Sequence, residues 1–203
     1  MSLFTLILII GFGLTIVLNM AFGFNFQTAL NLFLCFAITM LPAAVFLFVG
    51  RAMPKGAFDE NKKIFQVGKI RQNICSVLHV KSWKDKIPVG GRVAGFRMNR
   101  LDNPKDVSYL NRYVYESCFA EWLHTSCAVW AIAMLVFLPL VIGWNLFFTM
   151  ILPISILFAW QNMVSVVIQW YMRPRIIRLR NRIKIKEIQS INKEDELATE
   201  GNI

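Results

Sequence analysis

Two long stretches of this 203-residue chain contain no charged side chain. Residues 1–50 and 122–172 lack Asp, Glu, Lys and Arg, and all 34 acidic and basic residues lie in 51–121 and 173–203. A charge at the centre of a membrane-spanning helix costs about 2.5–3.5 kcal/mol, whereas the helices of a water-soluble domain carry charges along their exposed faces. The segregation therefore predicts an integral membrane protein.

The charge-free stretches are long enough for four transmembrane helices. A helix needs about 20 apolar residues to cross the hydrocarbon core, and polar or turn-forming residues divide each stretch into two runs. The first run has neither a basic leader nor a cleavage site, so it is interpreted as a span and not as a signal peptide. We expect one all-α membrane domain with spans at 2–22, 28–49, 123–142 and 146–171.

The two charged segments have the same sign. Residues 51–121 carry 14 basic and 7 acidic side chains, and residues 173–203 carry 8 basic and 5 acidic ones. Because Lys and Arg gather on the cytoplasmic side of membrane proteins, we expect both segments and both termini in the cytoplasm, with the protein in the cell membrane. Anionic lipid headgroups account for the net charge of +10 without a nucleic-acid partner.

The segment 51–121 contains two further helical patterns. Apolar residues in 65–78 recur at the spacing of an amphipathic helix that lies at the membrane interface. A second helix is expected to begin near Pro104, capped by Asp102 or Asn103, and to continue directly into the third span.

The domain organisation follows from these patterns. Residues 1–50 hold two transmembrane helices, 51–121 form a basic cytoplasmic and interfacial segment, 122–172 hold two more transmembrane helices, and 173–203 form a basic cytoplasmic tail. The run Arg173-Pro174-Arg175 is expected to end the fourth span, and residues 194–203 are expected to fray.

One histidine lies beside two carboxylates at the start of the third span. With about 100° per helical residue, His124 falls between Glu116 and Glu121, and Glu121 is close enough to contact it. A carboxylate beside an imidazole raises its basicity, as a general base for an alcohol proton requires. Two alternatives stay open: the three residues only solvate a helix end, or Glu121 and His124 bind a metal ion, for which further ligands are missing.

The fourth span carries a polar stripe. Asn162 and Gln169 are seven residues apart, and Arg173 continues the same face. Such a stripe lines a cavity or binds another helix, because it cannot face lipid cheaply. Earlier in the chain, the segment 81–86 places three lysines around Trp83, a pattern typical of a membrane anchor or of a site for an anionic group.

Three sequence blocks, in this order, resemble a known family. They are Lys81-Ser82-Trp83-Lys84-Asp85-Lys86-Ile87-Pro88, Glu116-x4-Glu121-x2-His124 and Asn162-x6-Gln169-x-Tyr171-x-Arg173-Pro174-Arg175. The blocks are similar to those of the glycosyl-4,4'-diaponeurosporenoate acyltransferases of staphylococci and their relatives, over roughly residues 60–180. The resemblance implies a membrane enzyme that esterifies a carotenoid-bound glucose with a fatty acyl chain.

The resemblance also suggests roles for the candidate residues. His124 would deprotonate the sugar hydroxyl of a glycosylated lipid or carotenoid, Glu121 would orient His124, and Glu116 would hold a sugar hydroxyl or stay structural. The acyl donor would be a thioester of coenzyme A or of an acyl carrier protein, with no bound cofactor and no metal. The expected substrate-binding side chains are Lys84, Lys86, Arg173 and Arg175 at the donor phosphates, Asn162 and Gln169 at the thioester carbonyl, and Trp83 and Tyr171 beside them.

Other classes of function remain open. A non-catalytic membrane protein that binds lipid or assembles a biosynthetic complex would show the same spans and basic segments. A metal-assisted transferase that uses Glu121 and His124 is a third alternative. The sequence has no nucleophile elbow, Walker loop or dinucleotide fingerprint, which excludes hydrolases and nucleotide-binding enzymes of those kinds.

Overall fold

The computed structural model describes residues 13, 14, 16, 17, 20, 21, 26–87, 101–142, 144 and 147–200. Every regular element within these residues is helical, which confirms the all-α class. In chain order the elements are α2 (Phe26–Ala52), the 3-10 turn η1 (Lys55–Phe58), α3 (Lys69–Val77), α4 (Val80–Trp83), the 3-10 turn η2 (Lys84–Lys86), α5 (Val107–Phe137), α6 (Pro139–Ile142), the π-helical turn η3 (Phe147–Ile151) and α8 (Leu152–Glu200).

Within the described residues, three helical segments are long and apolar enough to cross a membrane. They are Phe33–Ala52, Val107–Phe137 and Phe147–Ser190, with mean hydropathies of 2.4, 1.4 and 1.9 in their most apolar windows. These segments correspond to the second, third and fourth expected spans. The first expected span, 2–22, lies mostly outside the described residues, so the count of four remains a prediction.

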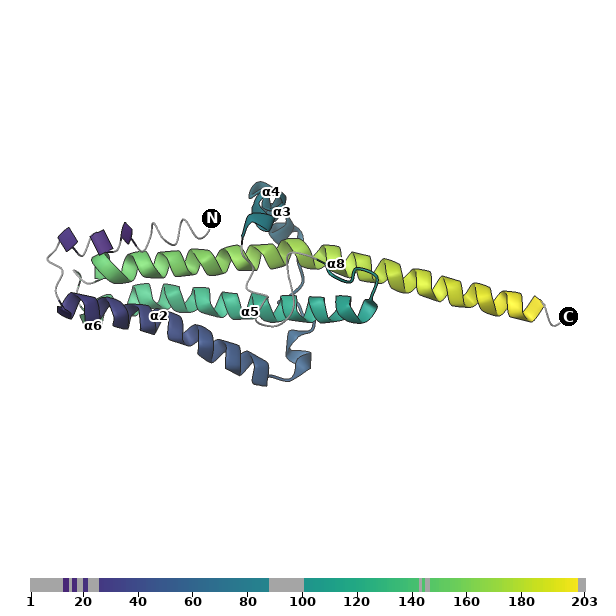
Figure 1. Ribbon diagram of the computed structural model, residues 1–203, viewed down its shortest axis with the longest axis horizontal. Coiled ribbons are helices and arrows are strands. Elements are labelled where there is room, and N and C mark those ends of the chain that lie inside the picture. Colours follow the sequence, from purple (N-terminus) through teal and green to yellow (C-terminus); the bar gives the residue numbers. More distant parts are fainter. Residues whose placement is uncertain are drawn as a thin grey trace.

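The centre of the molecule is an antiparallel pair of long helices, α5 and α8, which lie side by side (Figure 1). Helix α2 packs along this pair: Cys35 near its start packs with η3, and Arg51 near its end binds Glu116 of α5 (Figure 1). In the middle part of α2, side chains of this helix pack with Cys127 and Ala131 of α5 and with Phe158 of α8. Beyond α2, Leu110 of α5 and Ile176 of α8 belong to a separate core. The α5–α8 contact therefore extends past the part of the bundle that α2 covers.

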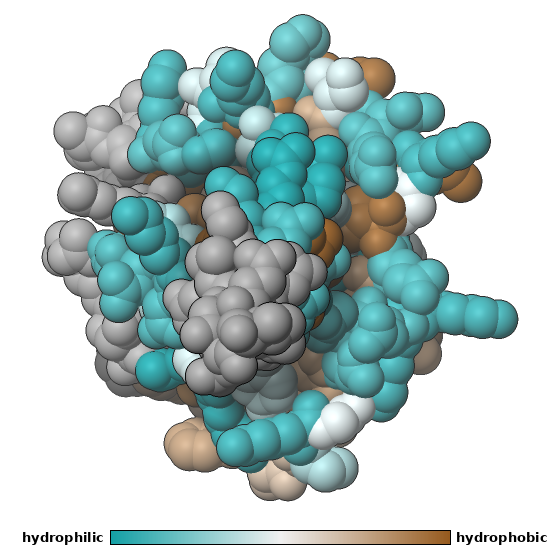
Figure 2. All heavy atoms as spheres, turned by 90° about the vertical axis from the view of Figure 1, so that its right-hand side faces the viewer, coloured by the Kyte–Doolittle hydropathy of each residue, from teal (hydrophilic) through white to brown (hydrophobic). Residues whose placement is uncertain are grey.

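Large apolar side chains cover the outside of the charge-free helices. Phe33, Leu41 and Phe48 of α2 and Leu140 of α6 are all exposed. A bilayer supplies the apolar neighbours that such a surface lacks in water. At the opposite end, where α8 terminates, hydrophilic side chains cover much of the surface (Figure 2). The two ends of the molecule are thus suited to hydrocarbon and to water.

A helix, α3, is present where an interfacial helix was expected, but it is shorter than predicted. It covers Lys69–Val77 and does not begin at Phe65, whose ring is buried in the preceding loop. Ile70 is 78% exposed and Val77 75% exposed, whereas Cys75 packs on α8. An exposed apolar face beside a buried one is the pattern of a helix that lies in the membrane interface.

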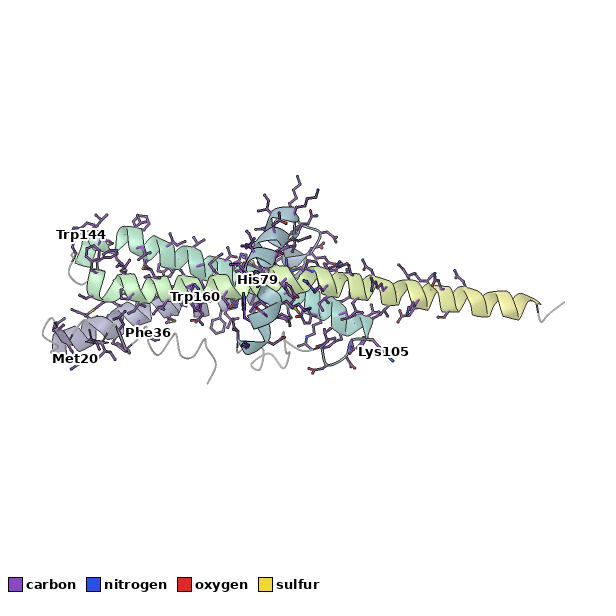
Figure 3. All side chains as sticks on the ribbon, turned by 90° about the horizontal axis from the view of Figure 1, so that it is seen from above. Met20, Phe36, His79, Lys105, Trp144 and Trp160 are labelled. Atoms are coloured by element: carbon purple, nitrogen blue, oxygen red, sulfur yellow. The ribbon has the colours of Figure 1, made fainter. Side chains whose placement is uncertain are left out.

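A left-handed residue joins α3 to α4. His79 has a φ of 48°, a conformation that is uncommon for residues other than glycine and that turns the chain sharply. The next residue, Val80, is completely buried and packs with Tyr171 of α8. The turn therefore places α3 and α4 across the middle of α8, where Figure 3 shows His79.

The start of α5 differs from the expectation. The helix begins at Val107, and its N-cap is Asp106, not Asp102 or Asn103. The Asp106 carboxylate accepts a hydrogen bond from the Ser108 amide at 2.8 Å, which satisfies one of the amide groups left unpaired at a helix start. As expected, the helix then continues without a break into the third span.

Helix α8 does not end at the run Arg173-Pro174-Arg175, where the fourth span is expected to end, and that end of the span stays a prediction. The helix passes through Pro174 and continues to Glu200, into the tail that was expected to fray. Proline removes one backbone hydrogen bond, but Ile176 and Ile183 beyond it pack against the first turns of α5. Tertiary packing therefore keeps the segment helical, as it does for most helices in proteins.

Candidate functional site

A row of polar side chains is enclosed between α5 and α8. Glu121 and His124 of α5 face Asn162 and Arg173 of α8, and Gln169 lies on the same buried stripe of α8. Spacings of three, four and seven residues bring these groups to one face of each helix. The polar stripe predicted from the sequence is thus an interior feature of the bundle and does not face lipid.

The partner of His124 is Asn162. The imidazole Nδ1 lies 2.8 Å from Asn162 Oδ1, and Asn162 Nδ2 donates to the Phe158 carbonyl oxygen at 2.8 Å. Because the amide nitrogen is used by Phe158, the oxygen faces His124 and can only accept a hydrogen bond. Nδ1 must then carry the proton, and in the neutral ring Nε2 keeps its lone pair. This arrangement prepares Nε2 to accept a proton.

The carboxylate of Glu121 does not contact His124, contrary to the expectation. Its Oε1 accepts hydrogen bonds from Arg71 at 3.0 Å and from the Trp170 indole at 2.8 Å. Its Oε2 lies 2.6 Å from Arg173 Nη2 in an ion pair. Two guanidinium groups neutralise this buried charge, so Glu121 holds three elements together and does not orient the imidazole.

Arg173 is also placed differently from the expectation. It is 1% exposed, and it donates to the Ser117 hydroxyl at 3.1 Å, the Ser117 carbonyl at 2.9 Å and the Phe65 carbonyl at 2.7 Å. With Glu121 as its counter-ion, most of its donors are already used by the protein. The side chain is therefore a poor ligand for a donor phosphate.

Glu116 belongs to another contact. Its two oxygens accept hydrogen bonds from Arg51 of α2 at 3.0 and 2.9 Å, and the Arg51 guanidinium lies 4.1 Å from the centroid of the Phe119 ring. Bidentate pairing of this kind is strong and geometrically specific. Of the two roles left open for Glu116, the structure supports the structural one, because this pair joins α2 to α5.

Two pockets lie beside the polar row. The first, the α3–α8 pocket, has a volume of about 1100 Å³ and is lined by residues of α3, α4 and α8, among them Lys81, Arg175 and Arg178. The second, the α2–α5 pocket, has a volume of about 500 Å³ and a mainly aromatic and aliphatic wall that includes Phe46, Trp122 and Trp130. Phe65 and Trp170 line both pockets, and His124 lines neither of them.

A model of the glycosyl-4,4'-diaponeurosporenoate acyltransferase family matches residues 60–182 of the chain. The chain belongs to this acyltransferase family. The matched range contains the whole polar row, α3, α4 and α5, and it leaves out α2. No curated protein and no solved structure matches the chain.

The remaining residues of the acyltransferase blocks are only partly brought together. Arg175 lines the α3–α8 pocket and lies over the Tyr171 ring, with 3.4 Å between the guanidinium carbon and the ring centroid. Lys84 pairs with Asp85 at 2.5 Å, Lys86 is exposed, and neither lysine lines a pocket described above. Of two further expected side chains, Trp83 is partly buried and donates to the Leu78 carbonyl at 2.7 Å, and Gln169 is 3% exposed.

Two residues that contact the polar row were missed by the sequence-based reasoning. Arg71 binds Glu121, and its guanidinium carbon lies 4.9 Å from the centroid of the Trp170 ring. Trp170 falls in the Gln169-x-Tyr171 block, at the position treated as variable, so the block itself could have indicated it. Nothing in the amphipathic pattern around Arg71 indicates a partner fifty residues away.

The described residues do not fit a metal-assisted acyltransferase that uses Glu121 and His124. They contain no group of three or more His, Cys, Asp and Glu side chains placed to hold an ion. The Glu121 carboxylate is directed at Arg71, Trp170 and Arg173, and His124 at Asn162. The two side chains therefore do not converge on one point, as ligands of a common ion must.

Proposed function

We propose that this protein is a membrane O-acyltransferase that moves a fatty acyl group from an activated thioester to a sugar hydroxyl of a glycosylated lipid or carotenoid. The observation that carries the proposal is the 2.8 Å contact between His124 Nδ1 and Asn162 Oδ1. That contact leaves Nε2 as the basic nitrogen of a neutral imidazole, and a histidine paired with an asparagine is an established way to hold a general base. Family membership supplies the reaction type.

In the proposed reaction, His124 Nε2 takes the proton of the sugar hydroxyl. The hydroxyl oxygen attacks the thioester carbonyl, the carbon–sulfur bond breaks, and the thiolate leaves with the proton that His124 returns. Asn162 stabilises the imidazolium by accepting from Nδ1 throughout. Because both polar ends of Asn162 are occupied, Gln169 is the remaining side chain for the carbonyl oxygen on which negative charge develops.

The acceptor and the orientation in the membrane belong to the same proposal. A glycosylated lipid or carotenoid would lie with its apolar part among the charge-free helices and its sugar near the charged segments. Both charged segments carry an excess of Lys and Arg, so we place them, and both chain termini, on the cytoplasmic side of the cell membrane. The sugar would then be acylated at the cytoplasmic leaflet.

One observation favours a second candidate function, a non-catalytic protein that binds lipid or assembles a biosynthetic complex. His124 lines neither the α3–α8 pocket nor the α2–α5 pocket. In this alternative the polar row only holds α5 to α8. Substitutions at His124 would then leave the lipid composition of the cell unchanged.

The deciding experiment compares the lipids of cells that express wild type, His124→Ala and Asn162→Leu at equal membrane levels. Loss of a general base lowers rates by about 10²–10⁴-fold, so we expect the acylated glycolipid or glycosylated pigment to disappear with His124→Ala. A smaller loss is expected for Asn162→Leu, which frees the imidazole to rotate. Lipids are quantified by mass spectrometry.

Ser165→Ala is the matched control for His124→Ala and Asn162→Leu. Ser165 lies on the same helix as Asn162, and its hydroxyl donates to the Gln161 carbonyl of that helix, so the product level of Ser165→Ala is expected to equal that of wild type. Identical lipid profiles for wild type and His124→Ala would remove His124 as the base and leave the non-catalytic function as the better account.

A further inference from the structure

The α3–α8 pocket gathers positive charge at the boundary between the charge-free helices and the tail. Lys81 of α4 and Arg175 and Arg178 of α8 all line it, and all three side chains are exposed. Arg175 and Arg178 are three residues apart and therefore share a helix face. The carboxylate in the wall, Glu60, is already bound to Arg180 at 2.8 Å. The three cations are thus not neutralised within the pocket.

Contacts with neutral groups hold Arg175 and Arg178 in place, so neither contact pairs the guanidinium with a carboxylate. Arg175 donates to the Tyr171 carbonyl and stacks on the Tyr171 ring, and Arg178 Nε donates to the Pro174 carbonyl at 3.2 Å. Each of these contacts uses one donor of a guanidinium that has five. The remaining donors are available to an anion, and a preorganised guanidinium loses less entropy on binding one.

Lys81 is positioned by the turn between α3 and α4. The left-handed conformation of His79 and the complete burial of Val80 fix the first residues of α4 against α8. Ser76 and Ser82 line the same pocket and add hydroxyl groups. A pocket of about 1100 Å³ with cations and hydroxyls is large enough for an organic phosphate ester.

The pocket also touches the polar row that contains His124 and Asn162. Trp170 lines the pocket and donates its indole proton to Glu121 of the polar row. A ligand whose phosphates occupy the pocket would therefore lie against the α5–α8 interface.

We propose that the α3–α8 pocket binds the phosphate groups of a coenzyme-linked acyl thioester, through Lys81, Arg175 and Arg178 and not through Lys84 and Lys86. This inference rests on the proposed acyl transfer and names the site of the donor. The headgroup of an anionic phospholipid presents the same phosphate chemistry, so the experiment separates the two sources.

The test measures binding of coenzyme A to the full-length protein in nanodiscs of zwitterionic lipid, by isothermal titration. Replacing one charged donor to a phosphate is expected to weaken binding about tenfold to a hundredfold. Arg175→Gln and Lys81→Gln should each show this loss, and the variant with all three cations replaced should show no measurable binding. The double variant Lys84→Gln/Lys86→Gln, which removes two nearby lysines outside the pocket, should bind as wild type does.

These binding measurements distinguish a failure of the proposed donor site from a failure of the proposed acyl transfer. His124→Ala should bind coenzyme A like wild type while transferring no acyl group, which would show an intact donor site in an inactive enzyme. If the triple variant transfers acyl groups from acyl-coenzyme A with an unchanged donor KM, the pocket is not the donor site, although the acyltransferase function stands. If coenzyme A does not bind but phosphatidylglycerol added to the nanodiscs is retained by wild type and lost by the triple variant, the pocket holds a lipid headgroup and the proposal is wrong.

Discussion

Among the described residues, Arg173 is the largest side chain that is fully buried, although it carries a charge. A buried cation is tolerated only when an anion and several acceptors replace the water it has lost. Glu121 provides the charge, and Ser117 and Phe65 provide the acceptors. A buried charge here requires complete pairing, and its partners come from two parts of the chain, helix α5 and the loop before α3.

Replacing Arg173 by methionine should therefore destabilise the protein strongly. The substitution keeps much of the side-chain volume but leaves Glu121 with one guanidinium partner, Arg71. Breaking a buried pair in this way costs about 3–5 kcal/mol, which is measurable as a lower midpoint of thermal unfolding in detergent.

The control for this substitution is Arg178→Met, on the same helix, because Arg178 is exposed. Its midpoint should stay close to that of wild type. Equal midpoints for both variants would show that the pairing of Arg173 contributes little to stability.

At the scale of the helices, Gly50 has the least space around it of the glycines that the structure describes, and it lies where α2 meets α5. A Cβ atom added to Gly50 would lie 2.6 Å from a ring atom of Phe119 and 2.6 Å from a ring atom of Trp122. Atoms cannot approach so closely, so any larger residue would push α2 away from α5. The absence of a side chain at Gly50 lets the two helices meet just before Arg51 binds Glu116.

Gly50→Ala is expected to lower stability even though alanine favours helix. Overpacking costs about 1–3 kcal/mol, whereas the gain in helix propensity is about 1 kcal/mol. The unfolding midpoint should fall, and the Arg51–Glu116 pair should be weakened. Gly56→Ala is the matched control, since a Cβ there meets nothing within 4 Å. A Gly50→Ala midpoint equal to that of the control would mean that α2 adjusts freely against α5.

At the scale of the whole molecule, the distribution of charge determines how the protein sits in a membrane. The exposed apolar surface of α2, α5 and α8 gives way to a hydrophilic end along α8 (Figure 2). The apolar face of α3, with Ile70 and Val77, lies between these regions and marks the interface. One long helix, α8, thus runs from the apolar region to the hydrophilic end.

The predicted orientation can be measured with a single introduced cysteine. Glu187→Cys places a thiol on the exposed outer part of α8. A membrane-impermeant maleimide should label it in inside-out vesicles and not in intact cells. Labelling in intact cells would place the tail outside and reverse the assignment.

Wild type is the control for this labelling, because all four native cysteines are free and buried. Burial raises the pKa of the Cys75 thiol above its usual value, although the charge of Arg175 opposes the shift. A thiol that stays protonated reacts slowly with maleimide, so little background from Cys75 is expected at neutral pH.

The sequence by itself determined the class of the protein. Charges are excluded from two long stretches because hydrocarbon cannot solvate them, and this predicted the helices α2, α5 and α8. The spacing of apolar residues in 65–78 predicted the helix α3. The spacing of Asn162, Gln169 and Arg173 correctly predicted that one face of α8 is polar and partnered. Sequence blocks around His124 and Arg173 indicated the family.

The tertiary structure alone decided which side chains meet. Helical periodicity predicts that Glu121 and His124 share a face, but it does not predict which groups of α8 and α3 lie opposite them. In the folded chain Glu121 binds Arg71 and Arg173, because two guanidinium groups neutralise it better than a neutral imidazole does, and His124 binds Asn162 instead. The same long-range packing extends α8 beyond Pro174 and places Lys81, not Lys84, at the α3–α8 pocket. Contacts between residues far apart in the chain depend on how helices pack, and no local pattern encodes that packing.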